Sequence, residues 1–173
     1  MQPTVAATCN GGFFLLNERN NMKIAGKEIK GLNEDVLVLP RKDGPIVLKG
    51  RAVKDFDIFE KLRPVPLPPG VLTKDGFQPD SKDKGYLAQL ANYNMQRMAW
   101  LAIQTLIPSE IEWDSVVIDD PQTWCHWTKD LADAGFNAVE QKRILDFVID
   151  VNCLNEAKLE AARADFVRGQ ATA

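Results

Sequence analysis

Histidine and cysteine are scarce in this chain of 173 residues, which contains one histidine and three cysteines. Cys9, Cys125 and Cys153 are odd in number and lack paired spacing, so we expect reduced thiols and no disulfide framework. Zinc sites draw on Cys and His at short paired spacings, which the sequence does not contain. It also lacks a phosphate-cradling glycine loop and a serine nucleophile motif. The sequence therefore predicts no metal, no cofactor and no catalytic residue.

An excess of positive charge is missing as well. The chain has 21 basic and 24 acidic residues, a net charge of −3, whereas nucleic-acid binding requires clustered Lys and Arg. We therefore expect no nucleic-acid partner. We interpret the densest basic stretch as the solvated surface of a hairpin, with a phosphate-binding face as the alternative. This stretch comprises Lys27, Lys30, Arg41, Lys42, Lys49, Arg51 and Lys54.

Long hydrophobic runs do not occur. The most apolar stretch, Met98–Ile107, is much shorter than the ~20 residues that a membrane-spanning helix needs. Residues 1–21 have no basic flank and only a brief apolar core, so they make a poor signal peptide, and Met22 follows them directly. We expect a soluble cytoplasmic protein in which residues 1–21 are a flexible leader, or an extension upstream of the functional start.

Cys125 and His126 are the one pair of residues that suggests an enzyme. Thiol catalysis needs an imidazole within hydrogen-bond reach of the sulfur, and adjacent residues on a helix do not face each other. We therefore expect a partly buried Cys125, an exposed His126 and no enzymatic activity. Three acidic residues are better explained as turn residues and a helix cap than as metal ligands. They are Asp114, Asp119 and Asp120.

A β-hairpin is predicted within residues 22–62. The apolar runs Val36–Leu39 and Ile46–Leu48 flank Asp43-Gly44, which signals a turn because Gly adopts positive φ without steric cost. Ile24 to Ile29 is a candidate third strand. Two strands alone would be marginally stable, so we expect this part to pack on another element or pair with a partner.

A short helix and a proline-rich connection follow the hairpin. Phe56, Phe59 and Leu62 lie at helical spacing and predict a helix that ends before Pro64. Residues 63–80 contain too many Pro and Gly for a helix or a central strand, so we expect an extended connection. Four apolar residues make it unusual for a linker: Leu67, Val71, Leu72 and Phe77.

Residues 81–169 predict a compact bundle of about four helices, and the fold class is therefore α+β, mainly α. The first helix runs from Asp80-Ser81 to about Ile107, and its second half is apolar nearly all round, as expected of a central buried element. The second begins at Asp120-Pro121, because Asp can accept from a free backbone N–H and Pro at the first helical position loses none. Gly135 ends it.

Two more helices complete the bundle. Asn137 and Glu140 have the spacing of a capping box, which starts the third helix. Its inner stripe comprises Ile144, Phe147, Val148 and Val151. Asn155 caps the last helix, whose predicted inward residues are Leu159, Ala162 and Phe166. The four tryptophans could form a ligand cage, but their spacing favours core packing: Trp100, Trp113, Trp124 and Trp127.

Short motifs follow one another closely in the helical part. They are Glu112-Trp-Asp-Ser-Val116, Asp120-Pro-Gln-Thr-Trp124, Leu131-Ala-Asp-Ala-Gly-Phe136, Glu140, Val148, Val151-Asn-Cys-Leu154 and Ala164-Asp-Phe166. Together with the preceding Arg97-Met-Ala-Trp100, they resemble phage tail assembly chaperone-type proteins of long-tailed bacteriophages. The resemblance covers roughly Asp83 to Val167. The hairpin and proline-rich link resemble the N-terminal part of such proteins more weakly.

The resemblance implies a non-enzymatic cytoplasmic factor of an infected bacterial host. Such a factor binds the tape measure protein and promotes assembly of tail-tube subunits on it. The expected partners are the tape measure protein, the tail-tube protein or both, with self-association as a further expectation. Two other functions are weighed beside it: a structural subunit of a phage particle, in its tail or neck, and a small intracellular regulatory binding protein.

A chaperone for a long helical partner needs exposed apolar surface. The four apolar residues of the connection, Leu67, Val71, Leu72 and Phe77, are the candidates for it. The alternative is that they fold back onto the helical part and join its core.

Overall fold

A computed structural model describes residues 23–24, 26–28, 31–74 and 76–171. These residues form an α+β, mainly α structure with five α-helices and three antiparallel two-stranded hairpins, which confirms the predicted fold class. Two compact units are present, Met1–Gly31 and Leu32–Ala173. The leader expected at residues 1–21 lies outside the described residues.

The first unit contributes one small hairpin. Strand β1 (Lys23–Ile24) pairs with β2 (Lys27–Glu28), and Gly26 between them has a φ of 79°. The candidate third strand at Ile24 to Ile29 therefore does not extend the main hairpin. Among the described residues of this range, Ile24 pairs with Lys27, and Glu28 pairs with Lys23.

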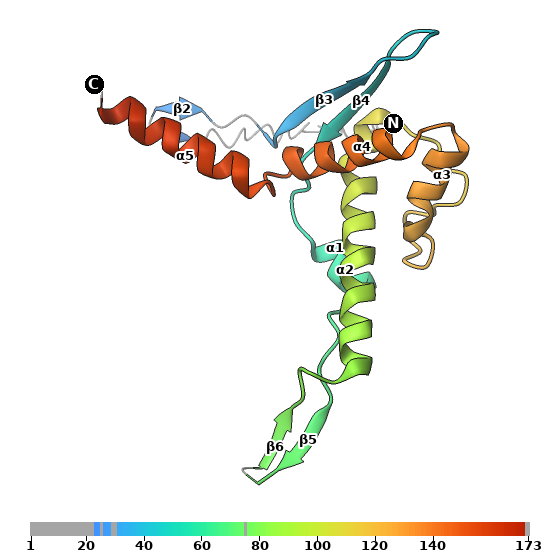
Figure 1. Cartoon of the computed structure of the whole chain (residues 1–173), viewed down its shortest axis with the longest axis vertical. Coiled ribbons are helices and arrows are strands. Elements are labelled where there is room, and N and C mark those ends of the chain that lie inside the picture. The colour runs from blue at the N-terminus through green and yellow to red at the C-terminus, as the bar shows by residue number, and fades with distance from the viewer. Residues whose placement is uncertain (1–22, 25, 29–30, 75, 172–173) are drawn as a thin grey trace, which may run out of the picture. The chain divides into compact units, whose positions relative to one another are not determined.

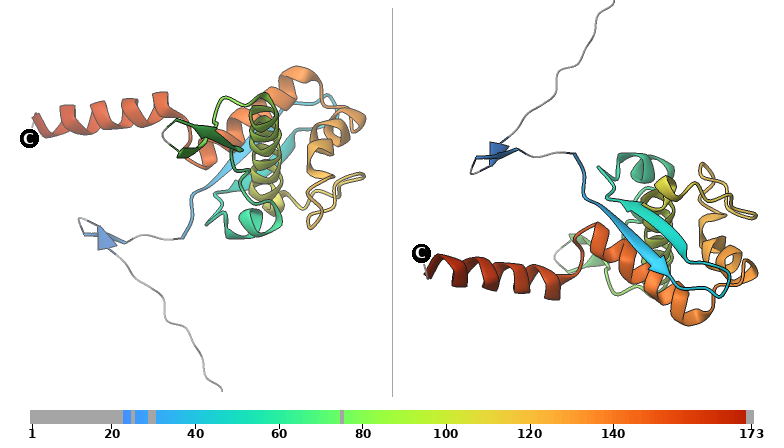
Figure 2. Two further views of the ribbon diagram at one scale, coloured as in Figure 1. Left: turned by 90° about the horizontal axis from the view of Figure 1, so that it is seen from below. Right: turned by 90° about the horizontal axis from the view of Figure 1, so that it is seen from above.

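The predicted main hairpin forms in the second unit. Strand β3 (Glu34–Leu39) pairs with β4 (Ile46–Arg51), with Leu37 opposite Leu48. Alternate side chains point to opposite faces of a strand, so one face carries buried Leu39 and Leu48 while the other carries exposed valines. This hairpin lies alongside helix α4 (Ala138–Val151) (Figure 2). The contact is close at Gly50, where a Cβ atom would lie 2.7 Å from the Phe147 ring.

Helix α2 (Lys84–Thr105) is the central element, and its two halves differ. No residue before Tyr93 in this helix is buried, whereas Ala99 to Ile103 are all buried. Helix α4 and the short 3₁₀ helices η1 (Ile107–Ser109) and η2 (Trp124–His126) pack against α2, and α3 (Trp127–Asp133) packs against α4 and η2 (Figure 1). The prediction that the second half of α2 is buried is confirmed.

Phe59 of α1 (Asp57–Leu62) lies at the centre of an aromatic cluster. It is fully buried, and its ring centroid lies 5.3 Å from Tyr93, 5.6 Å from Trp100 and 5.8 Å from Trp124. Trp127 is also buried, while Trp113 packs half-buried against the same core. Core packing of the tryptophans is therefore confirmed, and a ligand cage is excluded for the three buried ones.

Asn152, directly after α4, joins three parts of the core. Its Oδ1 accepts from the Val53 N–H, and its Nδ2 donates to Thr105 Oγ1 and to the Val148 carbonyl, each at 2.8 Å. Nearby, Asn33 Nδ2 donates to the Val151 carbonyl at 2.8 Å. The connection after β4 and the ends of α2 and α4 are therefore fixed to one another.

One core thus contains residues from the hairpin, α1 and the helices. Leu39 and Leu48 of the hairpin belong to the same cluster as Ile144 and Val148 of α4. The expected boundary at residue 81 is not a boundary between packed units, because Leu32–Ala173 form a single one. Sequence periodicity identifies the elements, but it does not reveal which of them share an interior.

The second predicted helix starts later than expected. Asp120 Oδ1 accepts from the Gln122 N–H at 3.0 Å, and residues 121–123 form a turn before η2 and α3. Asp120 is therefore a turn residue and not the cap of an α-helix. Gly135 has the expected positive φ of 90°, and Asn137 and Glu140 form the predicted capping box.

Helix α5 (Glu156–Ala171) forms where predicted but does not pack as predicted. Asn155 Oδ1 accepts from the Lys158 N–H at 3.3 Å, in agreement with its role as a cap. All three residues expected to face inward are exposed: Leu159, Ala162 and Phe166. The helical pattern was correct, but the core cluster contains no residue of α5. Among the described residues, no helix combines the length and apolarity needed to cross a membrane.

Candidate functional site

The proline-rich connection contains a third hairpin that the sequence did not predict. Strand β5 (Gly70–Thr73) pairs with β6 (Gly76–Pro79), and Leu72 lies directly opposite Phe77. The prolines lie outside the paired stretch or at its last position, where a missing N–H does little harm. Gly76 supports the turn with a φ of 104°. The expectation of an extended connection without strands is therefore wrong for residues 70–79.

Phe77 and Leu72 define one face of this hairpin, because directly opposed residues in an antiparallel pair project to the same side. Gly70 lies on that face as well. A Cβ atom on Gly70 would lie 1.8 Å from Phe77 Cε1, so the Phe77 ring lies across the glycine backbone. Val71 projects to the opposite face. Because Gly70 has no side chain, the exposed ring of Phe77 can lie against the backbone of the neighbouring strand.

The four candidate residues are exposed to different degrees. Leu67, Leu72 and Phe77 are exposed at 83%, 80% and 76%, and Val71 at 45%. They do not fold back into the core of the described structure, which was the alternative. The structure brings Val71, Leu72 and Phe77 together on one hairpin, whereas Leu67 precedes it. We call Leu72 and Phe77 together the hairpin apolar face.

A short turn fixes this hairpin to the beginning of α2. The Asp80 N–H donates to the Pro69 carbonyl at 2.8 Å and closes the open end of the hairpin. Asp83 then caps α2, because its Oδ1 accepts from the Tyr86 N–H at 2.7 Å. The hairpin is therefore presented at the exposed end of a 22-residue helix (Figure 1).

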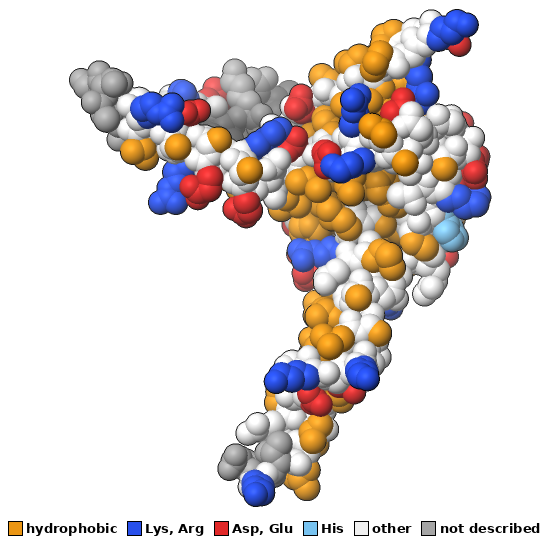
Figure 3. Space-filling model, viewed as in Figure 1, with side chains coloured by type: hydrophobic (Ala, Val, Ile, Leu, Met, Phe, Trp, Pro, Cys, Tyr) orange, Lys and Arg blue, Asp and Glu red, His pale blue; other side chains and the backbone are white. Residues whose placement is uncertain are grey.

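Charged side chains surround the hairpin without covering it. Lys74 follows β5, and Lys82 and Lys84 lie beside the beginning of α2, all of them exposed. Figure 3 shows hydrophobic side chains on the hairpin and along α2, with basic and acidic groups between them. This mixture fits an amphipathic protein segment better than a purely apolar ligand.

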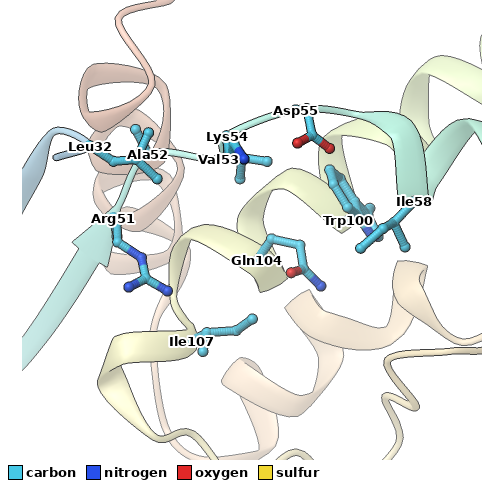
Figure 4. Close-up of a pocket in the computed structure, with 10 residues that line it drawn as sticks. All are labelled: Leu32, Arg51, Ala52, Val53, Lys54, Asp55, Ile58, Trp100, Gln104 and Ile107. Atoms are coloured by element: carbon cyan, nitrogen blue, oxygen red, sulfur yellow. The ribbon is translucent and has the colours of Figure 1, made fainter. Parts of the chain in front are cut away.

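A recess of about 200 Å³ lies beside the second half of α2 and is a weaker candidate. Figure 4 shows Trp100 and Gln104 of α2 facing the connection that carries Lys54 and Asp55. Arg51 at the end of β4 completes its rim. Its lining mixes scattered charges with apolar groups, and we find no arrangement of a nucleophile, base or ligand set among them.

Cys125 and His126 lie together in η2, and both are exposed. The expectation of a partly buried Cys125 is therefore wrong, because the last residues before α3 form a 3₁₀ turn that leaves the thiol outside. Cys125 Sγ donates to the Gln122 carbonyl at 3.7 Å. Within the described part of the chain, the thiol and the imidazole form no hydrogen bond with each other.

Asp130 is the one buried carboxylate among the described residues. Burial by itself raises the pKa of a carboxyl group, but N–H donors from Ser115 and Val116 outweigh it and hold the pKa of Asp130 below 3.8. Asp130 Oδ2 accepts from the Ser115 N–H at 2.8 Å, which fixes the loop before η2 onto α3. Its role is structural. No group of His, Cys, Asp or Glu in the described ranges could hold a metal ion.

Comparisons with protein-family models, with curated proteins and with solved structures find no match to this chain.

Proposed function

We propose that this protein is a non-enzymatic assembly chaperone or adaptor that binds a partner protein through the hairpin apolar face. The observation that carries the proposal is the exposure of Leu72 and Phe77, at 80% and 76%, on a hairpin held at the end of α2. Burying one such side chain stabilises by roughly 1.5–3 kcal/mol, so two left in water favour a binding role.

The partner proposed from the sequence resemblance is the tape measure protein of a long-tailed bacteriophage, on which tail-tube subunits assemble. An amphipathic helix binds by placing apolar side chains at helical spacing against such a surface. The exposed lysines beside the hairpin, Lys74, Lys82 and Lys84, suit acidic residues on the polar flanks of that helix.

The test is the affinity for a helical segment of the tape measure protein encoded by the same phage. Isothermal titration calorimetry compares the full chain with a Leu72→Ser, Phe77→Ser variant. The expected result is at least a tenfold weaker dissociation constant, since two buried apolar contacts are lost.

A matched control changes two exposed valines away from the hairpin. Val117→Ser with Val139→Ser removes side chains exposed at 56% and 62%, and it should leave the affinity unchanged. Equal affinities for all three proteins would contradict the proposed role of the hairpin.

A structural subunit of the phage particle is the second candidate. This function is supported by a second exposed apolar surface, which lies on α5. A subunit within an assembly contacts neighbours on more than one side, so it needs more than one such surface. Mass spectrometry of purified virions separates the two functions. A structural subunit is present in stoichiometric copies, whereas a chaperone is depleted from the finished particle.

A further inference from the structure

Helix α5 carries an apolar stripe that nothing in the described chain covers. Leu159 and Phe166 are exposed at 45% and 65%, and Ala162 between them is also exposed. Most helical stability in proteins comes from packing an apolar face, and isolated helices of about this length are marginal in water. We call Leu159, Ala162 and Phe166 the α5 stripe. The exposure of the α5 stripe indicates that another molecule binds to it.

The start of α5 is held in place by Asp150 of α4. Asp150 Oδ1 accepts from Asn155 Nδ2 at 2.9 Å, and its Oδ2 accepts from Lys158 Nζ. These two contacts set the direction in which α5 leaves α4 (Figure 1). The stripe is therefore presented outward and not folded onto the core.

An apolar recess of about 270 Å³ lies close to the point where α5 begins. Leu154, exposed at 51%, lines it just before α5, and Arg97 lies at its edge with the guanidinium 4.4 Å from the Phe56 ring. The other lining residues are Asn94, Met98 and Leu101. Figure 3 shows hydrophobic side chains gathered between the start of α5 and α2. A recess suited to an apolar side chain therefore lies close to the beginning of the helix that carries the α5 stripe.

The α5 stripe alternates large and small residues at spacings of three and four, which is the pattern of paired helices. In an antiparallel pair of two such helices, large residues can face small ones. If the two-fold axis of the pair passes between Glu160 and Ala161, Leu159 packs against Ala162 of the second copy. The same register places Phe166 opposite Asn155 of the second copy, next to Leu154 at the edge of the apolar recess. One arrangement therefore covers both the stripe and the recess.

Charges flanking the stripe agree with the antiparallel direction. By helical geometry, Glu156 and Arg163 lie along one edge of the stripe, and Lys158 and Asp165 along the other. In an antiparallel pair, each edge of the stripe faces the same edge of the second copy. Glu156 therefore lies near Arg163 of the second copy, and Lys158 lies near Asp165 of the second copy. Parallel helices would bring Lys158 beside Arg163, which is repulsive.

Glu156 and Arg163 can change partners on association, whereas Asp165 of the second copy would approach Lys158 beside the contact that Lys158 already makes with Asp150. Arg163 lies 3.5 Å from Glu160 within the same helix, and both side chains are more than two-thirds exposed. Such exposed pairs contribute little.

We propose that a second copy of this chain occupies this surface, through antiparallel pairing of the two α5 helices with Phe166 of each copy at the Leu154 recess of the other. The proposal does not depend on the proposed function, because the hairpin apolar face lies on other residues. A dimer of this kind would present two hairpins to a partner.

Sedimentation velocity over a range of concentrations tests the association. The full chain should form a dimer, and Leu159→Ser with Phe166→Ser should weaken the dimer at least tenfold. Val139→Ser is the matched control, because Val139 is exposed at 62% at the start of α4, away from α5, and it should leave the association unchanged. A monomer at every concentration up to about 0.5 mM, or a dimer unaffected by the double substitution, would overturn the proposal.

Cysteine cross-linking tests the direction of the pair. In a chain carrying Cys9→Ser, Cys125→Ser and Cys153→Ser, Leu154→Cys and Phe166→Cys proteins are prepared separately, mixed and oxidised in air. Position 154 precedes α5, and position 166 lies ten residues, or about 15 Å at 1.5 Å per residue, beyond the first residue of that helix, so only antiparallel pairing brings the two positions together across the dimer. Disulfides between the two different chains support the proposal. Disulfides formed mainly between two Phe166→Cys chains would contradict it.

Discussion

Two regions of this protein contain similar apolar side chains in opposite surroundings. The second half of α2 lies in a core with Phe59, Trp124 and the inner face of β3 and β4, and these side chains are almost completely buried. In the part of α2 before Tyr93, in the β5–β6 hairpin and in α5, none of the residues whose burial the structure describes is buried. Apolar composition alone therefore does not mark the interior of this chain.

The two regions should respond differently to substitution. Side chains in the core are held by several elements at once, so their substitution should affect the folded state as a whole. The apolar residues of the hairpin and of α5 contact mainly their own element, so their substitution should affect association and leave folding intact. The predictions below test this difference.

The largest effect is expected for Phe59→Ala. Phe59 is fully buried between three aromatic rings, and removing such a side chain destabilises by about 3–5 kcal/mol. Thermal denaturation followed by circular dichroism should show a decrease of about 2–4 °C for each kcal/mol. A change of less than about 3 °C would mean that the aromatic cluster is not central to stability.

Asn152→Ala should have the next largest effect. The substitution removes the acceptor of the half-buried Val53 N–H and the donor to Thr105, whose side chain is fully buried. A buried polar group left unsatisfied costs about 1–3 kcal/mol. Urea denaturation measures the loss, and Asn155→Ala, outside the core, is the comparison that should cost less.

Glycine substitutions compare the two regions directly. Gly50→Ala places a Cβ atom 2.7 Å from Phe147, which α4 holds in the core, and overpacking of this kind costs about 1–3 kcal/mol. Gly70→Ala clashes more severely with Phe77, but Phe77 is exposed and can rotate away. We expect a clear loss of stability for Gly50→Ala only. Similar losses in both variants would remove the distinction between the regions.

These contrasts show what the sequence could and could not predict. The capping box at Asn137, the turn at Gly135 and the burial of Trp100 were predicted because each depends on residues a few positions apart. The β5–β6 hairpin was missed because the surrounding prolines argue against strands, and each strand of the hairpin is only four residues long. The exposure of the α5 stripe was missed because periodicity gives a helix its apolar face but not the surface that covers it.

The candidate site was predicted only in part. Leu67, Val71, Leu72 and Phe77 were selected for their apolar area in a segment rich in proline, and their exposure agrees with that choice. Their arrangement was not accessible, since it depends on the register that places Leu72 opposite Phe77. The need for glycine at position 70 appears only once that register is known.

A smaller effect on stability is expected at low pH, through the buried carboxylate of Asp130. The pKa of Asp130 is lower in the folded chain than 3.8, so its contribution to stability is present above that pH and is lost as the pH falls through the lower folded value. Asp130→Asn should cost about 1 kcal/mol at pH 7, because a neutral acceptor binds the Ser115 N–H less strongly. The variant should lose less stability than the wild type between pH 4 and pH 2. Identical acid denaturation curves would exclude this role for Asp130.

The most direct test of the central claim is the thermal stability of the Leu72→Ser, Phe77→Ser variant. The two side chains are exposed at 80% and 76%, and they lie on a hairpin outside the core. Differential scanning calorimetry at low protein concentration should find a melting temperature within about 2 °C of the wild type, since the free energy of unfolding should change by less than ~1 kcal/mol. A decrease of 5 °C or more would show that the hairpin apolar face belongs to the interior and would contradict its assignment as a binding surface.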